Sequence, residues 1–153
     1  MFEISKKIIP LYEKELQKLS EEISLYRSES DLWKLDDGIK NSGGNLALHM
    51  FGNLNHFIGA VLGKSGYKRN RDLEFSDKNV PREKIISEIE KVKQVISDTL
   101  SGISDEEMQQ NYPIEFLGRI PTTIELLFVI YGHLTYHLGQ LNYHRRLLER
   151  QSI

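Results

Sequence analysis

The spacing of apolar residues along the chain predicts four long helices. In a first segment, from about Phe2 to Leu25, apolar residues recur every three or four positions, the period of one buried helix face. The same period follows the sequence Asn41-Ser42-Gly43-Gly44 up to about Leu62, and it returns from Glu83 to Leu100 and from Pro121 to about Glu149. Four helices of this length predict that residues 1–153 form a single all-α domain, a four-helix bundle.

Two apolar rows show which faces are expected to be buried. In the first segment the row is Ile8, Leu11, Leu16, Leu19 and Ile23. In the second segment it is Leu46, Met50, Leu54, Phe57 and Val61. Both rows follow the regular α-helical period and are therefore expected to face the core.

Local signals predict where the helices begin. Asn41 to Gly44 supplies cap and turn residues before the second helix, and Pro81 stands at the first turn of the third. Thr122 and Glu125 form a capping box before the last helix. Ser104 and the acids after it predict one short helical turn.

The remaining segments are expected to be irregular. The polar stretches 28–40 and 63–80 are expected to form loops. Residues 112–119 are expected to be extended, as part of a small hairpin.

Composition and charge narrow the possible functions. The hydrophobic content of 39% and charged content of 27% are ordinary for a globular protein, and a net charge of -2 gives no reason to expect a nucleic-acid partner. The longest apolar run, 124–131, is too short to cross a membrane, and no signal peptide is visible, so we expect a cytoplasmic protein with no membrane partner. The chain contains no cysteine, which excludes thiolate ligands and a protein thiol nucleophile.

Histidines on the last predicted helix suggest a metal site. His133 and His137 are four positions apart and therefore neighbours on one face, beside the apolar row. His144 lies in the same angular sector but seven residues past His137, about 10 Å along the axis. It is too far away to bind the same ion.

The second predicted helix carries two further histidines on the flank of its apolar row. His49 and His56 are also seven residues apart, so only one of them can complete a set with His133 and His137. Neutral imidazole is the commonest protein metal ligand, and facing helices of bundles build metal sites. Helix geometry leaves the choice between His49 and His56 open.

The neighbouring residues exclude two known kinds of site. No histidine follows a glutamate by three positions, as in di-iron bundles, and Leu134 replaces the glutamate of an HExxH metalloprotease. A mononuclear site with three nitrogen ligands and open positions remains, the arrangement of a catalytic metal. One divalent ion is expected. Nitrogen ligands suit Zn, Ni, Fe and Cu alike, and of these we expect Zn, Ni or Fe. The alternative is a non-catalytic bundle that acts as a metal-binding or structural module.

Three stretches of sequence resemble the DinB-like superfamily of proposed metal-dependent enzymes, which includes bacillithiol and mycothiol S-transferases. They are NSGGNLALHMFGN at 41–53, GYKRNRDLEF at 66–75 and GHLTYHLGQ at 132–140. The resemblance implies an up-and-down four-helix bundle, often a homodimer. It also implies a metal held by one histidine of the second helix and two of the last. The matching residues are His49, His133 and His137, so the resemblance selects His49 over His56.

The chemistry expected of such a site is thiol transfer or a related hydrolysis of a small molecule. A three-histidine ion with open positions acts as a Lewis acid or lowers the pKa of a bound water or thiol. Because the chain has no cysteine, any thiol would come from a low-molecular-weight cosubstrate. Around the ligands, the residues expected to support them or line the pocket are Asn53, Gln140 and Tyr136. The loop residues expected to bind an anionic substrate are Arg69, Arg71 and Arg119.

Two glycines inside the last predicted helix point to assembly. Gly132 and Gly139 lie away from the histidine and leucine rows, and each costs about 1 kcal/mol relative to alanine. Such a pair indicates the close approach of another helix, either a neighbour in the bundle or a second subunit. We expect a homodimer.

Overall fold

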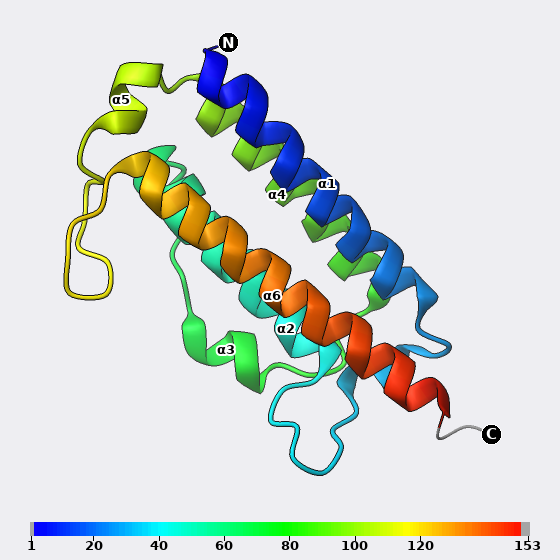
Figure 1. Ribbon diagram of the computed structural model, residues 1–153. Helices are drawn as coiled ribbons and strands as arrows, with labels where there is room; N and C mark the ends of the chain where they lie inside the picture. The colour runs from blue at the N-terminus through cyan, green and yellow to red at the C-terminus, as the bar shows by residue number, and fades with distance from the viewer. Residues whose placement is uncertain (1, 151–153) are drawn as a thin grey trace.

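The computed structural model describes residues 2–150, and four long helices dominate them (Figure 1). They are α1 (Glu3–Leu25), α2 (Gly43–Leu54) with its π-helical continuation η2 (Asn55–Leu62), α4 (Arg82–Ser101) and α6 (Thr123–Arg150). The predicted all-α four-helix bundle is confirmed. None of the described helices combines the length and the apolar character needed to cross a membrane.

The helices pack as two antiparallel pairs, α1 with α4 and α2 with α6 (Figure 1). Near one end of the first pair the Ser5 hydroxyl donates to the Leu100 carbonyl, and near the other end Arg82 donates to the Tyr26 carbonyl. The successive long helices α2 and α4 run in the same direction, because residues 63–81 return along the bundle before α4 begins (Figure 1). The resemblance implied long helices that alternate in direction along the chain, and α2 and α4 do not alternate.

One core joins all four long helices. Its fully buried residues on α1 include Leu16, Leu19 and Ile23, as the apolar row predicts, whereas Leu11 is 41% exposed. Tyr12 takes the inward position beside it and donates a hydrogen bond to the Leu127 carbonyl at 2.6 Å. That hydrogen bond satisfies the phenol in the interior and fixes α1 against α6.

The π-helical segment η2 changes which residues of the second helix face the core. Hydrogen bonds from residue i to i+5 widen each turn, so the α-helical period stops predicting burial once the segment begins. Leu46, Met50 and Leu54 are buried as expected, but Ile58 is buried in place of Phe57. From this point onward the predicted row lies at the edge of the core, where Phe57 and Val61 are only partly buried, and His56 lies in the same segment.

Three short helices connect the long ones: η1 (Glu29–Trp33, a 3-10 helix), α3 (Arg71–Ser76) and α5 (Asp105–Gln109). The helical turn predicted after Ser104 is confirmed as α5, whereas η1 and α3 lie in stretches expected to be loops. Two isolated antiparallel bridges, Asn111 to Thr122 and Phe116 to Arg119, form the expected small hairpin. The capping box is also present, since the Thr122 hydroxyl accepts from the Glu125 amide and the Glu125 carboxylate accepts in return.

The two glycines of α6 face outward. A Cβ built on Gly132 or Gly139 would meet no atom within 4 Å outside its own helix. The suggestion that a neighbour within the bundle approaches these glycines was therefore wrong.

Candidate metal centre

Packing of α2 against α6 brings three histidines together. The Nε2 atom of His133 lies 3.2 Å from that of His49 and 3.0 Å from that of His137. One ring nitrogen from each residue falls within 4.8 Å of the others. His49 is buried, and the two histidines of α6 are half-buried. The cluster therefore has a closed side at α2 and a more open side at α6.

The closed side depends on α3, which lies against α2. Asn45, in the first turn of α2, donates through its side-chain amide to the backbone carbonyls of Glu74 and Asp77, both at 2.9 Å. Asn70 caps the start of α3 by accepting from the Leu73 amide. These contacts fix a short helix that could not form alone. Its acidic side chain is thereby directed at His49.

Glu74 holds His49 from behind. Its carboxylate lies 2.8 Å from Nδ1 of His49, and Arg69 binds both carboxylate oxygens, at 2.6 and 2.9 Å. Burial by itself raises the pKa of Glu74, but the hydrogen bonds from His49 and Arg69 outweigh it and lower the pKa below its usual value. A carboxylate only accepts, so Nδ1 of His49 carries the proton. In the neutral ring, Nε2 then presents a lone pair to the cluster.

Gly52 makes room for this carboxylate. It lies three residues after His49, and a Cβ at this position would fall 1.8 Å from a carboxylate oxygen of Glu74. The carboxylate cannot move aside freely, because both of its oxygens are bound by Arg69 or His49. Any larger side chain at position 52 therefore disturbs the contact behind His49.

Gln140 holds His137 in the same way. Its side-chain oxygen lies 2.7 Å from Nδ1 of His137, and its amide nitrogen donates to the Tyr136 hydroxyl at 3.3 Å. The amide oxygen accepts the Nδ1 proton, so Nε2 of His137 also presents a lone pair. Two of the three imidazoles are thus fixed in the tautomer that a metal ligand requires.

The donor set fits a divalent cation. The Nε2 lone pairs of His49 and His137 both point at Nε2 of His133. A single proton on that nitrogen can form a hydrogen bond with only one of them. Two nitrogens bound to one tetrahedral zinc at about 2.0–2.1 Å are about 3.4 Å apart, close to the separations found here. Burial, followed by the charges of His137 and His49, lowers the pKa of His133 to about 4, which keeps the ring neutral near pH 7. The three histidines are positioned to bind a metal ion.

Asn53 lies one turn beyond His49 on α2 and is 7% exposed. Within the described part of the chain, its side-chain oxygen accepts no hydrogen bond. A buried acceptor without a donor is costly, so this oxygen has capacity for a water or a ligand. Tyr136, by contrast, is 63% exposed, and it reaches the cluster through Gln140 and a ring contact of 5.3 Å with His137.

The three candidate arginines lie in different environments. Arg69 is engaged by Glu74 and supports His49 indirectly. Arg71 is exposed and lies over the Phe75 ring, which itself stacks beside His49 with centroids 4.9 Å apart. Arg119 is in the hairpin and pairs with Glu125 at 3.5 Å, eight residues or about 12 Å of helix before His133. The structure does not bring Arg119 to the cluster.

The histidines outside the cluster have other partners. His56 is half-exposed and packs edge-on against Phe57. His144 is buried, with one ring nitrogen 2.7 Å from the Tyr26 hydroxyl and the other 2.8 Å from the Lys34 carbonyl. The sequence reasoning that excluded His144 from the cluster is confirmed.

Sequence reasoning missed Glu74. The carboxylate lies 25 residues from His49 on a segment interpreted as a loop, so no helical spacing connects the two. Two signals were available. Asn70 followed by acids is a helix start, and Gly52 inside an apolar helix indicates a close approach.

Comparisons with known proteins agree with this fold. The sequence profile of a family described as "Protein of unknown function (DUF1572)" matches residues 6–153. The chain belongs to the DUF1572 family. None of the curated proteins compared matches it.

Among solved structures, the DUF1572 chain is similar to the crystal structure of a DinB-like protein from Bacillus cereus. The alignment covers 88% of this chain and 86% of the other, with a TM-score of 0.65 and 18% sequence identity. At this identity the likeness concerns the fold. The predicted DinB-like fold is confirmed.

The contact between Gly52 and Glu74 leads to a prediction about stability. We expect Gly52→Ala to lower the free energy of unfolding by about 1–3 kcal/mol, because the added methyl group forces the bound carboxylate to move. Urea denaturation followed by circular dichroism measures the change.

Gly102→Ala is the matched control. This glycine follows α4 at φ -88°, and a Cβ there meets only ordinary contacts, the nearest at 3.6 Å. Alanine should raise the free energy of unfolding by about 0.4–1 kcal/mol by restricting the unfolded chain. A shift of the same sign and size in both variants would contradict a special role for Gly52.

Proposed function

We propose that this protein is a mononuclear metal-dependent enzyme that acts on a small molecule, as a thiol S-transferase or a hydrolase. The observation that carries the proposal is the convergence of three imidazole nitrogens, two of them with their opposite ring nitrogens held by Glu74 and Gln140. The proposed ligands are His49, His133 and His137. Zn, Ni and Fe are the proposed ions, and the nitrogen set also suits Cu.

The polar residues behind the cluster have a defined role in this proposal. Glu74 keeps His49 in the required tautomer and places a negative charge behind it, which makes the ring a stronger donor. Gln140 does the same for His137 without a charge. Arg69 holds Glu74 ionised and in place. These groups orient the ligands and do not themselves react.

The open side of the cluster leaves room for a substrate. A divalent ion bound there would act as a Lewis acid and lower the pKa of a water or thiol. The thiol of a transferase reaction would come from a cosubstrate, since the chain has no cysteine. Asn53 supplies a free buried acceptor one turn away, and Arg71 supplies an exposed positive charge near His49. A cytoplasmic location stays a prediction.

Metal binding is the first test. Untagged protein should bind one equivalent of divalent metal, and His49→Ala, His133→Ala and His137→Ala should each weaken binding by more than about 100-fold. Glu74→Gln should weaken it by about 10–100-fold, because the amide keeps an acceptor oxygen but loses the charge. Isothermal titration with Zn and elemental analysis measure both effects.

The controls for metal binding are His56→Ala and Asp72→Asn. His56 lies on the same helix outside the cluster, and Asp72 is an exposed acid on the same short helix as Glu74. Both variants should bind metal like the wild-type protein. Less than about a tenth of an equivalent in wild-type protein after supplementation with Zn, Ni, Mn and Fe would rule out the proposed enzyme.

Turnover is the second test. Metal-loaded protein is assayed with low-molecular-weight thiols against an alkyl halide and with water against activated esters. In thiol transfer, sulfur bonds to carbon, the halide leaves and the thiol proton goes to solvent. We expect turnover that falls by more than about 100-fold in His137→Ala while circular dichroism shows an intact fold. Full metal occupancy without turnover in either panel would favour a non-catalytic metal-binding module.

We further propose that the outward face of α6 is the interface of a homodimer. This face exposes Phe128 and Tyr143, with the open glycines Gly132 and Gly139 on either side of Tyr136. Exposed apolar residues on one face are typical of protein contacts. In two antiparallel copies related by a two-fold axis midway between the glycines, Gly132 would lie opposite Gly139 of the partner subunit and Phe128 opposite Tyr143 of the partner subunit. Such a self-complementary face suits a two-fold interface.

Light scattering tests this assembly. Wild-type protein should show twice the chain mass of 17.8 kDa, and Phe128→Asp should shift it toward one chain by placing a charge in the contact. Leu117→Asp is the control, since Leu117 is 88% exposed at the hairpin tip. A single-chain mass for wild-type protein at working concentrations would contradict the homodimer.

A further inference from the structure

A cavity of about 410 Å³ lies about one helical turn from the histidine cluster, although none of the three histidines lines it. It lies between the segment Gly38–Asn41, the first turn of α2 and the C-terminal half of α6. Leu46 and Gln140 line it, and each is three residues, about one helical turn, from a proposed ligand. Its volume is in the range of pockets that hold small molecules.

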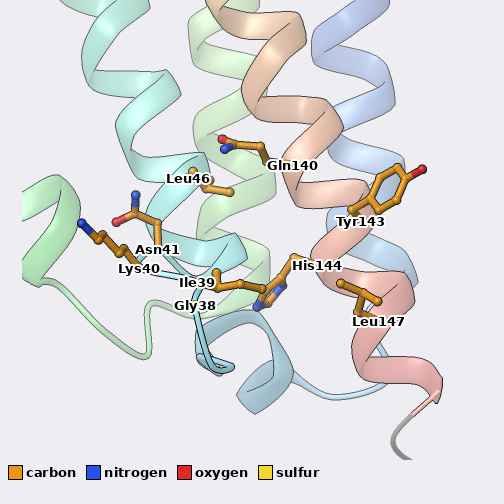
Figure 2. A pocket seen from close by; sticks show the side chains of 9 residues that line it. All are labelled: Gly38, Ile39, Lys40, Asn41, Leu46, Gln140, Tyr143, His144 and Leu147. Atoms are coloured by element: carbon orange, nitrogen blue, oxygen red, sulfur yellow. The ribbon is translucent and has the colours of Figure 1, made fainter.

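Figure 2 shows how the side chains surround this cavity. Gln140 extends from α6 toward α2, and Leu46 lies below it. At the opposite end, His144 points toward Ile39. Both ring nitrogens of His144 already have partners, the Tyr26 hydroxyl and the Lys34 carbonyl. His144 is therefore a fixed wall of the cavity and has no free nitrogen for a ligand.

The lining is suited to an apolar group. Besides His144, the residues that line it are Gly38, Ile39, Lys40, Asn41, Leu46, Gln140, Tyr143 and Leu147. None of them is acidic, and Lys40 carries the one formal charge. Within the described residues, no hydrogen bond or ion pair engages the side chain of Lys40 or of Asn41.

Lys40 lies at the mouth of the cavity. Its side chain is exposed, and in Figure 2 its amine is turned away from the lining. An exposed lysine changes rotamer within nanoseconds, so the amine can meet a negative group at the mouth. Asp36 and Asp37 belong to the same loop but do not line the cavity. Lys40 is therefore the one formal charge on the lining itself, and its amine can pair with an anion at the mouth.

Gln140 connects the cavity to the histidine cluster. Its amide oxygen is bound to His137, and the same side chain lines the cavity. A molecule that fills the cavity therefore touches the residue that orients a proposed metal ligand. Among the described residues, Gln140 is thus the one shared by the cavity lining and the hydrogen bonds of the cluster.

We propose that this cavity binds the body of the substrate, and that the substrate is a small organic anion in which an apolar body separates the reacting group from the negative group. The apolar body lies against Leu46 and Leu147, the reacting group lies beyond Gln140 at the histidines, and the negative group lies at Lys40. The identity of this molecule as a substrate rests on the proposed function. The cavity and its preference for anions do not.

The preference is tested first on metal-free protein. Three probes share one apolar tail and differ in charge: phenylbutyrate, phenylbutyramide and phenylbutylamine. Titrations followed by ¹H–¹⁵N NMR should show the tightest binding for the carboxylate and the weakest for the amine. The side-chain amide signals of Gln140 should shift on binding.

Variants then locate the binding. Leu147→Trp and Ile39→Trp, from opposite walls, should each weaken all three probes by about tenfold or more by filling the cavity. Lys40→Gln should weaken only the carboxylate, by about twofold to fivefold, the range of an exposed ion pair. Lys14→Gln, an exposed lysine on α1, is the matched control and should change nothing.

A final experiment joins the cavity to the cluster. In zinc-loaded protein, the hydroxamate of phenylbutyrate should bind more tightly than acetohydroxamate, and Leu147→Trp should abolish this advantage. Equal binding of both hydroxamates by zinc-loaded protein would show that cavity and cluster are separate, and would overturn the proposal.

The titrations of metal-free protein test whether the cavity binds organic anions, independently of whether the protein binds a metal. Absence of probe binding, or tighter binding of the amine than of the carboxylate, would overturn the proposal even if metal binds. If metal does not bind but the probes bind in the expected order, the proposed binding cavity is supported and the proposed metal-dependent activity is contradicted.

Discussion

The buried pair of Glu74 and Arg69 sets the geometry of the whole site. A carboxylate removed from water loses several kcal/mol of hydration unless it is bound on all sides. Here both oxygens are bound, by Arg69 and by His49. This requirement explains why Gly52 has no side chain, and why α3 is fixed to α2 through Asn45. The orientation of His49 follows from it.

The long helices could be predicted from the sequence because their signals are local. A 3.6-residue period and a capping box depend on residues only a few positions apart, and His133 and His137 lie together by helical spacing alone. The same argument failed in η2, where the turns widen and Ile58 replaces Phe57 in the core. It failed also for Leu11, which the period placed inward although Tyr12 fills that position.

The parts of the site that could not be predicted depend on packing between distant segments. The choice between His49 and His56 came from a resemblance, because spacing on one helix cannot show which of its residues faces another helix. Glu74 reaches His49 only because α3 folds back along α2, which no local pattern indicates. Arg69 was expected to bind substrate, but its two bonds to Glu74 make it part of the support for His49.

The histidine cluster is closed toward α2 and more open toward α6, and this asymmetry favours a catalytic metal over a purely structural one. A structural metal site uses four protein ligands and is closed, whereas three donors leave a position for water or substrate. Here the two rings on α6 are half-buried, and the helical turn that follows them lines a cavity. Gln140 is the link between the two, because its side chain both binds Nδ1 of His137 and lines the cavity. A group bound in the cavity would therefore touch the residue that orients one of the three imidazoles, which is the arrangement expected of a binding site and not of a metal that only supports the fold.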